Sequence, residues 1–183
     1  METLDMFKDE IYANLLKNYI VADSLELYPH FEWLEKQVDF LLNYDSYGCC
    51  RPVELRNLFY DTFQELFPYN GVIYHGFVSF KDKEEVIKGF NGLLSFSSNA
   101  KVAYNFATSC DNITSNIIIK ECTNDGFDFR KFLITIGKYI SINNYHVYIK
   151  EYEILAPHNF NNYTIINCKD KKFNKLNFKK GDD

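Results

Sequence analysis

The sequence contains no apolar run that approaches the ~20 residues a helix needs to span a bilayer. Residues 1–5 provide neither the basic start nor the apolar core of a secretory signal. We therefore expect a cytoplasmic protein with no membrane partner. These observations agree equally well with a protein that acts in the cytoplasm of a host cell, after delivery by a route that needs no cleavable signal.

The sequence also lacks a metal-binding cysteine pattern and an excess of positive charge. The five cysteines are odd in number and do not have the spacing of metal ligands, so we expect no metal site. Cys49 and Cys50 are adjacent and can scarcely pair with each other, which favours reduced thiols over disulfides. The net charge of −5 argues against a general nucleic-acid-binding protein, and we expect no nucleic-acid partner.

Apolar and aromatic residues are abundant, at 46% and 17% of the chain. A packed globule is therefore expected rather than disorder, and 183 residues are enough for one domain with a sizeable core. We predict that residues 1–70 form a helical region of that domain and residues 71–168 a β-rich core. Residues 169–183 form a Lys-rich tail that we expect to be exposed.

Residues 1–70 show apolar residues at helical spacing in three places. The first helix is expected to bury Leu4, Phe7, Ile11 and Leu15, and the second is expected to bury Phe31, Leu34, Val38 and Leu41. The third helix is expected to begin at Pro52. Its expected buried residues are Val53, Leu55, Leu58, Phe59 and Leu66. Residues 68–71 are expected to end the third helix. His30 and Trp33 are expected in the core or at its rim, and no recognisable chemistry is assigned to these helices.

After Gly71 the pattern changes to short runs typical of strands. The expected strands are Val72–Phe77, Leu93–Ser97, Ile117–Ile119, Tyr139–Ile142, Ile154–Ala156 and Tyr163–Cys168. Two helices are expected among them, a charged one at Asp82–Phe90 and one at Ala100–Ala107 that is capped by Ser98 or Asn99 and buries Val102, Ala103 and Phe106. We expect the cysteines beside these elements to be small core residues, namely Cys110, Cys122 and Cys168.

Two acidic residues begin the apolar stretch from Lys150 to Pro157. In a continuous strand, Glu151 and Glu153 lie on one face, about 7 Å apart, and repel each other. This pattern suits a site in which one carboxylate faces a developing positive charge and the other takes up a proton. The alternative is an edge strand with two solvated acids.

Four segments, in this order, resemble motifs of the mono-ADP-ribosyltransferase family. The first is Tyr74-His75-Gly76, at the place of an aromatic-Arg-Gly run, and the second is Ser95-Phe96-Ser97 with the following Ala103-Tyr104-Asn105-Phe106. The third is Tyr139-Ile140-Ser141, and the last is Glu151-Tyr152-Glu153 before an apolar strand. The resemblance covers residues 71–168 and is closest to toxin-like and phage-encoded members of the arginine-serine-glutamate class.

The first motif departs from that class, because His75 stands where the class has arginine. A histidine is shorter than an arginine and cannot offer a bidentate fork to the phosphates. The diphtheria-toxin and poly-ADP-ribose polymerase branch, however, has His-Gly at this place. The chain therefore resembles a hybrid of the two branches, and the effect of His75 on NAD affinity is left open.

The resemblance implies an α+β fold in which N-terminal helices pack on a split, mostly antiparallel β-sandwich with an NAD cleft between its halves. It implies transfer of ADP-ribose from NAD, a substrate, to a protein acceptor, on arginine, without a metal. Glu153 would stabilise the oxocarbenium-like sugar, Glu151 would deprotonate the acceptor, and Ser95 would hold Glu153. The residues implied at NAD are Tyr74, His75, Gly76, Ser97 and Phe106.

Other interpretations remain open for the function and for single residues. Water could replace the acceptor, which gives an NAD glycohydrolase, or the fold could serve a catalytically inactive binding protein. Ser95 and Ser97 could be helix caps, Gly76 could relieve a bulge, and His75 could be an ordinary partly buried histidine. In the loop before Glu151, the candidates for contact with a target protein are Tyr145, His146 and Tyr148.

Overall fold

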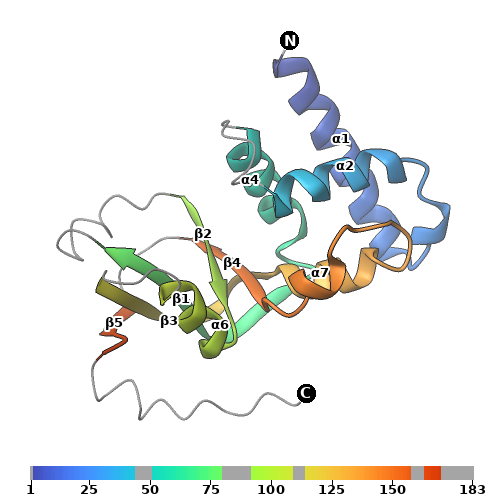
Figure 1. The fold of residues 1–183 in the computed structure, drawn as a ribbon. Helices are drawn as coiled ribbons and strands as arrows, with labels where there is room; N and C mark the ends of the chain where they lie inside the picture. The colour runs from blue at the N-terminus through green and yellow to red at the C-terminus, as the bar shows by residue number, and fades with distance from the viewer. Residues whose placement is uncertain (1, 44–50, 80–91, 109–113, 158–162, 170–183) are drawn as a thin grey trace.

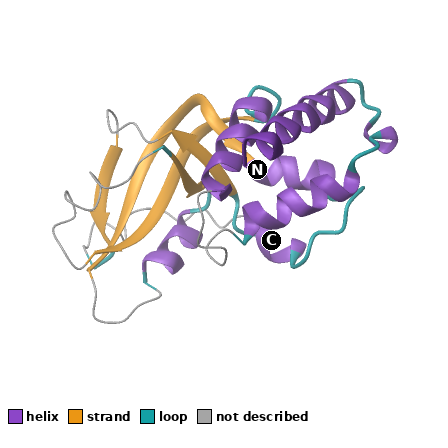
Figure 2. Ribbon diagram, turned by 90° about the horizontal axis from the view of Figure 1, so that it is seen from above, coloured by secondary structure: helices purple, strands orange, loops and turns teal. Residues whose placement is uncertain are grey.

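The computed structural model describes residues 2–43, 51–79, 92–108, 114–157 and 163–169 (Figure 1). These residues form an α+β protein, as predicted, and Figures 1 and 2 show most helices gathered on one side of a β-sheet. Of the helices within these ranges, none is long and apolar enough to cross a membrane. The predicted features outside the described residues are the helix at 82–90, the cysteines Cys49, Cys50 and Cys110, and the tail from residue 170.

The predicted N-terminal helices are present. They are α1 (Glu2–Val21), α2 (Phe31–Leu42) and α4 (Arg51–Phe63), and a 3-10 helix, η1 (Leu25–Leu27), separates the first two. The buried residues of α2 include Leu34, Val38 and Leu41, as the spacing predicted. In α4, Leu55 and Phe59 are buried as predicted, whereas Val53 is exposed.

The predicted buried face of α1 is wrong. Phe7, Ile11 and Leu15 are 63%, 43% and 36% exposed, and Ala13 and Leu16 are buried in their place. Apolar residues occur on more than one side of this helix, so spacing alone does not select its inner face. The selection is made by packing, because the side with Ala13 and Leu16 meets the core formed by the other helices.

His30 and Trp33 lie at the rim of the helical core, as expected. The His30 ring stacks on the Tyr12 ring with 4.0 Å between centroids. The indole Nε1 of Trp33 donates a hydrogen bond of 2.8 Å to Oδ1 of the buried Asp9. These contacts are structural, because they join α1 to the start of α2.

The strands form one five-stranded sheet in which every described pairing is antiparallel. They are β1 (Pro68–Ser79), β2 (Leu93–Ser97), β3 (Thr114–Asp128), β4 (Glu153–Pro157) and β5 (Tyr163–Asn167). The strand predictions in these five places are confirmed. Residues 68–71 begin β1 and do not end the third helix, so the predicted division at residue 70 falls inside a strand.

Pairing divides the strands into two groups, β1–β3–β5 and β2–β4, which are joined by a few residue pairs. β1 pairs with β3 along its whole length, and β5 lies on the other edge of β3. β2 pairs with all of β4, with Ser97 opposite Glu153. Between the groups, Tyr74 pairs with Ser97, and the end of β3 pairs with Ile154 and Leu155. The sheet therefore curls, and Ser97 has Tyr74 as one strand neighbour and Glu153 as the other.

The predicted strand at Tyr139–Ile142 is wrong. After β3 the chain enters α7 (Phe129–Ile136) directly and then passes through turns to a short helix, α8 (Tyr145–Tyr148). The buried residues of α7 follow the helical spacing i, i+3, i+4 and i+7, namely Phe129, Phe132, Leu133 and Ile136. The Ser141 amide donates to Glu35 Oε1 at 2.9 Å, so a side chain of α2 satisfies this backbone group where a strand neighbour was expected.

The helices and the sheet share one hydrophobic core. The Phe132 ring of α7 lies 5.6 Å and 5.0 Å from the Phe59 and Phe63 rings of α4, and 5.8 Å from the Phe127 ring of β3. Leu155 of β4 belongs to the same cluster. The helical region therefore packs on the sheet through this shared core. Cys122, predicted as a small core residue, is fully buried in a second cluster within the sheet.

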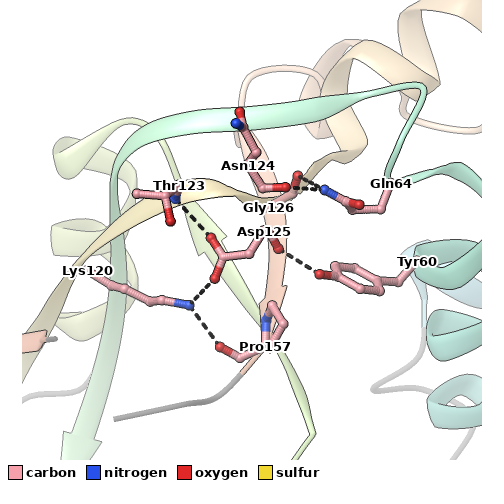
Figure 3. Close-up of polar contacts among 8 residues, drawn as sticks. All are labelled: Tyr60, Gln64, Lys120, Thr123, Asn124, Asp125, Gly126 and Pro157. Atoms are coloured by element: carbon pink, nitrogen blue, oxygen red, sulfur yellow. Dashed lines mark hydrogen bonds and ion pairs between the residues drawn. The ribbon is translucent and has the colours of Figure 1, made fainter. Parts of the chain in front are cut away.

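A buried lysine joins β3 to β4 near the point where the β1–β3 register shifts (Figure 3). Lys120 is 6% exposed, and its Nζ lies 3.0 Å from Asp125 Oδ2 and 3.1 Å from the Pro157 carbonyl oxygen. The second carboxylate oxygen of Asp125 accepts from the Thr123 amide at 3.0 Å. The Tyr60 hydroxyl of α4 donates to the Asp125 carbonyl at 2.7 Å, so the network ties three elements together.

Asp125→Asn is expected to lower the free energy of unfolding by about 2 kcal/mol, between the values for exposed and buried ion pairs. Burial alone would raise the pKa of Asp125, but the Lys120 ammonium and the Thr123 amide lower it below its usual range. The stabilisation is therefore complete above the ordinary pKa of about 3.9 and is lost as the pH falls through the folded-state value. Urea unfolding at neutral pH and in acid measures both effects.

Asp61→Asn is the matched control, because it removes an exposed carboxylate from α4. Equal stability of the two variants at neutral pH would contradict the role given to the Lys120–Asp125 pair.

Candidate active site

One cleft of about 340 Å³ lies between the helical region and the curled sheet. Its walls come from α2, β1, β2, α8, the start of β4 and α6 (Ala100–Ala107), the short helix that lies against the sheet in Figure 1. All eight residues that the sequence predicted for a site are among those that line it: Tyr74, His75, Gly76, Ser95, Ser97, Phe106, Glu151 and Glu153. Four motifs were predicted in order along the chain, and the cleft gathers residues of three of them.

Ser95 holds Glu153 in this cleft. Ser95 and Ser97 are two residues apart on β2 and therefore lie on the same face of that strand. Glu153 is the first residue of the neighbouring strand, β4. The Ser95 hydroxyl donates a hydrogen bond to Glu153 Oε1. Burial raises the pKa of Glu153, while the Ser95 hydrogen bond and the charge of Arg56 oppose that rise. The carboxylate is therefore partly removed from water and held in one orientation.

Glu151 reaches the cleft by a route that the sequence did not predict. It lies in the turn before β4, not on a continuous strand, so the expected strand alternation of Glu151 and Glu153 is wrong. Tyr152 between them is left-handed, with φ of 53°, and the Arg130 guanidinium lies 4.3 Å from the centre of its ring. The Ser97 hydroxyl donates to the Glu151 carbonyl at 2.7 Å and holds the turn against β2.

The environment of Glu151 makes its carboxylate more basic. Burial raises the pKa of Glu151, and the nearby negative charge of Glu153 raises it further. Tyr148 of α8 also lines the cleft, and its hydroxyl donates to Asn43 Oδ1 at 3.1 Å. Burial and the charge of Glu151 raise the pKa of Tyr148. The other two loop candidates, Tyr145 and His146, do not line the cleft.

His75 is a neutral histidine with a defined tautomer. Its Nδ1 lies 2.7 Å from the Ser95 carbonyl oxygen, which can only accept, so Nδ1 carries the proton. Burial lowers the pKa of His75, and the charge of Arg56 lowers it further, although the bond to Ser95 opposes this. The ring contributes no positive charge to the cleft at neutral pH.

Gly76 is required for the close packing of α6 on β1. A Cβ atom at this position would lie 1.9 Å from the Ala103 carbonyl oxygen and 3.0 Å from the Ala107 amide nitrogen. The α6 helix has the predicted bounds and is capped by Asn99, whose side chain accepts from the Lys101 amide at 3.0 Å. The glycine therefore has a packing reason that holds without any ligand or bulge.

The predicted burial of two α6 residues is wrong. Phe106 is 58% exposed and Val102 is partly exposed, and both line the cleft. The buried residues of this helix are Ala103 and Ala107, whose small side chains let the helix approach β1. Exposed Phe106 thus forms part of an apolar wall of the cleft.

The helical region contributes two features that the sequence did not predict. Leu41 and Leu42 of α2 line the cleft. Arg56 of α4 donates from Nη2 to Ser95 Oγ at 2.9 Å, a contact with a cleft residue that was not expected of these helices. The only sequence signal for Arg56 was its position beside Leu55, at the border of a buried helix face.

Within the described ranges, no three His, Cys, Asp or Glu side chains lie close enough together to hold a metal ion. Comparison of the chain with protein-family models, curated proteins and solved structures found no match. The class defined by fold and site is thus an α+β protein with a carboxylate-containing cleft.

Proposed function

We propose that this protein is an NAD-dependent mono-ADP-ribosyltransferase that modifies arginine side chains of a protein. The observation that carries the proposal is the Ser95–Glu153 hydrogen bond in a cleft that Glu151 and the Tyr74-His75-Gly76 motif also line. The two groups of strands around this cleft agree with an ADP-ribosyltransferase-like split sandwich. The free thiols of Cys122 and Cys168 agree with a cytoplasmic site of action, in the producing cell or in a host.

The reaction begins with cleavage of the bond between nicotinamide and ribose. The bonding electron pair leaves with the nicotinamide nitrogen, and the ribose carbon becomes oxocarbenium-like. A carboxylate beside this carbon stabilises the positive charge, and a partly buried position strengthens the effect. Glu153 is assigned this role, because Ser95 holds its carboxylate in the cleft.

The acceptor then needs help to become a nucleophile. A guanidinium is always protonated in water, so one of its nitrogens must lose a proton as it attacks the ribose carbon. Glu151 is assigned as the base that takes this proton, since its raised pKa makes it a better acceptor than an ordinary glutamate. Its position in a turn and its partial exposure suit contact with a second protein.

The lining residues fit the nicotinamide–ribose end of NAD better than its diphosphate. Phe96, Val102 and Phe106 offer an apolar wall for a planar ring, and the carboxylates and the neutral His75 offer partners for ribose hydroxyls. Among the described residues that line the cleft there is no lysine or arginine, so these residues do not hold the diphosphate by ion pairing.

Incubation of the pure protein with labelled NAD and a cell lysate tests the proposal. Labelled protein bands that are lost after treatment with an arginine-specific ADP-ribosyl hydrolase are the expected result. Free nicotinamide without labelled bands would replace the transferase by an NAD glycohydrolase. The absence of both labelled bands and free nicotinamide would favour a catalytically inactive binding protein on this fold and would overturn the proposed activity.

Glu151→Gln is expected to abolish transfer to arginine while it spares much of the NAD hydrolysis. The glutamine keeps the shape but cannot accept the acceptor's proton, whereas cleavage of NAD depends on Glu153. The measurement is nicotinamide release, in parallel with label incorporation into protein. Equal loss of both activities would contradict this division of roles and indicate that the two acids act as one unit.

A further inference from the structure

A basic side chain of the helical region reaches the carboxylate end of the cleft. Arg56 projects from α4, and its Nη2 donates to Ser95 Oγ at 2.9 Å. The hydroxyl of the same Ser95 donates to Glu153 Oε1. The three side chains form one chain of hydrogen bonds that runs from α4 through β2 to β4. Arg56 itself is not among the residues that line the cleft.

The chemistry of the three groups sets the direction of both hydrogen bonds. A guanidinium has donors but no acceptor, an ionised carboxylate has only acceptors, and a serine hydroxyl has a single proton and two lone pairs. Ser95 must accept from Arg56, which leaves its one proton for Glu153. We propose that Arg56 is a positioning residue, which fixes the Ser95 hydroxyl as a donor and thereby keeps the Glu153 carboxylate oriented in the cleft.

The charges around Glu153 agree with this role. Neutral His75 of β1, Glu151 of the preceding turn and Tyr148 of α8 line the same cleft, and none of them supplies a positive charge. Burial raises the pKa of Glu153, and the two influences that lower it are the Ser95 hydrogen bond and the charge of Arg56. Arg56 contributes to both, because it also orients Ser95.

The inference rests on the proposed function for its catalytic consequence, but its direct readout does not. Carbon-13 NMR titration of the Glu153 carboxyl in the NAD-free protein is the first measurement. The variants are Arg56→Met, which removes donor and charge, and Arg56→Gln, which keeps a neutral donor on a shorter side chain and is used if the methionine variant fails to fold. Lys17→Met is the matched control, because it removes one positive charge from α1, where Lys17 pairs with Glu65 at 3.7 Å.

Both Arg56 variants are expected to raise the pKa of Glu153, and Lys17→Met is expected to leave it unchanged. In turnover, kcat for nicotinamide release should fall about 10- to 100-fold, the usual effect of losing an outer hydrogen-bond partner. KM for NAD should change much less, since Arg56 does not line the cleft. The acid limb of the rate profile should move to higher pH, because Glu153 must be ionised to act.

Non-additivity separates positioning through Ser95 from a general structural effect. In a Ser95→Ala background, Arg56→Met should lower kcat much less than in the wild-type background, since the intermediary is already absent. A folded Arg56 variant in which Glu153 titrates as in the wild-type protein overturns the inference. A wild-type protein that releases no nicotinamide, but whose Glu153 pKa rises on Arg56 substitution, supports the inference and overturns only the proposed function.

Discussion

Glu153→Gln is expected to lower nicotinamide release by about 10²–10³-fold, the usual effect of removing one preorganised electrostatic contact. The glutamine keeps the size of the side chain and can still accept from Ser95. Under the proposed function, the loss therefore measures the effect of the negative charge on the oxocarbenium-like sugar. Steady-state nicotinamide release at saturating NAD is the measurement. Glu121→Gln, which changes an exposed glutamate of β3, is the control and should keep wild-type turnover.

The same substitution should not destabilise the protein at neutral pH. Burial raises the pKa of Glu153, so the folded state binds its proton more tightly than the unfolded state does. Stability therefore falls as the pH rises from the ordinary glutamate pKa of about 4.3 to the raised folded-state value. Glutamine cannot ionise, so the Glu153→Gln variant does not lose stability in this way as the pH rises.

Near-normal turnover of Glu153→Gln would contradict the central role that the proposed mechanism gives to Glu153.

Gly76→Ala is expected to lower the free energy of unfolding by about 3 kcal/mol, the upper part of the usual range for overpacking. The added Cβ would lie 1.9 Å from the Ala103 carbonyl oxygen, and this oxygen belongs to the backbone of α6, which cannot rotate away. The helix must shift from β1, so the cleft wall with Val102 and Phe106 is lost as well. Urea unfolding measures the first effect and NAD binding by the folded protein the second.

Gly92→Ala is the matched control for the glycine substitution. A Cβ at Gly92 would meet no atom within 4 Å, and the expected cost is only that of its left-handed φ of 71°, about 1 kcal/mol. A Gly76→Ala variant as stable as Gly92→Ala would show that α6 does not depend on close approach at Gly76.

Elements with strong local signals were predictable from the sequence. The α6 helix has the predicted bounds, Ala100–Ala107, because its capping residue and its apolar spacing lie within one short segment. The α2 face with Leu34 and Val38 was predictable for the same reason. The order of the sequence motifs was sufficient to name eight residues that line one cleft.

The α1 face and the route of Glu151 to the cleft were decided by the tertiary structure. Apolar residues of α1 lie on more than one side, and only the packed core determines that Ala13 is buried and Phe7 exposed. Glu151 reaches the cleft because the backbone of Tyr152 is left-handed. In this conformation the Tyr152 ring lies against the Arg130 guanidinium. No alternation of acids in the sequence indicates such a turn.

The sequence by itself determined the α+β class and most elements, because spacing and capping act within a few positions. Its motifs also named eight of the residues that line the cleft. Only the tertiary structure decided which distant groups meet. Arg56 and Ser95 are 39 positions apart, and their hydrogen bond exists because α4 packs on the shared core beside β2. The cost of closing such loops is met by burial of apolar surface across the whole core, so no local pattern specifies the contact.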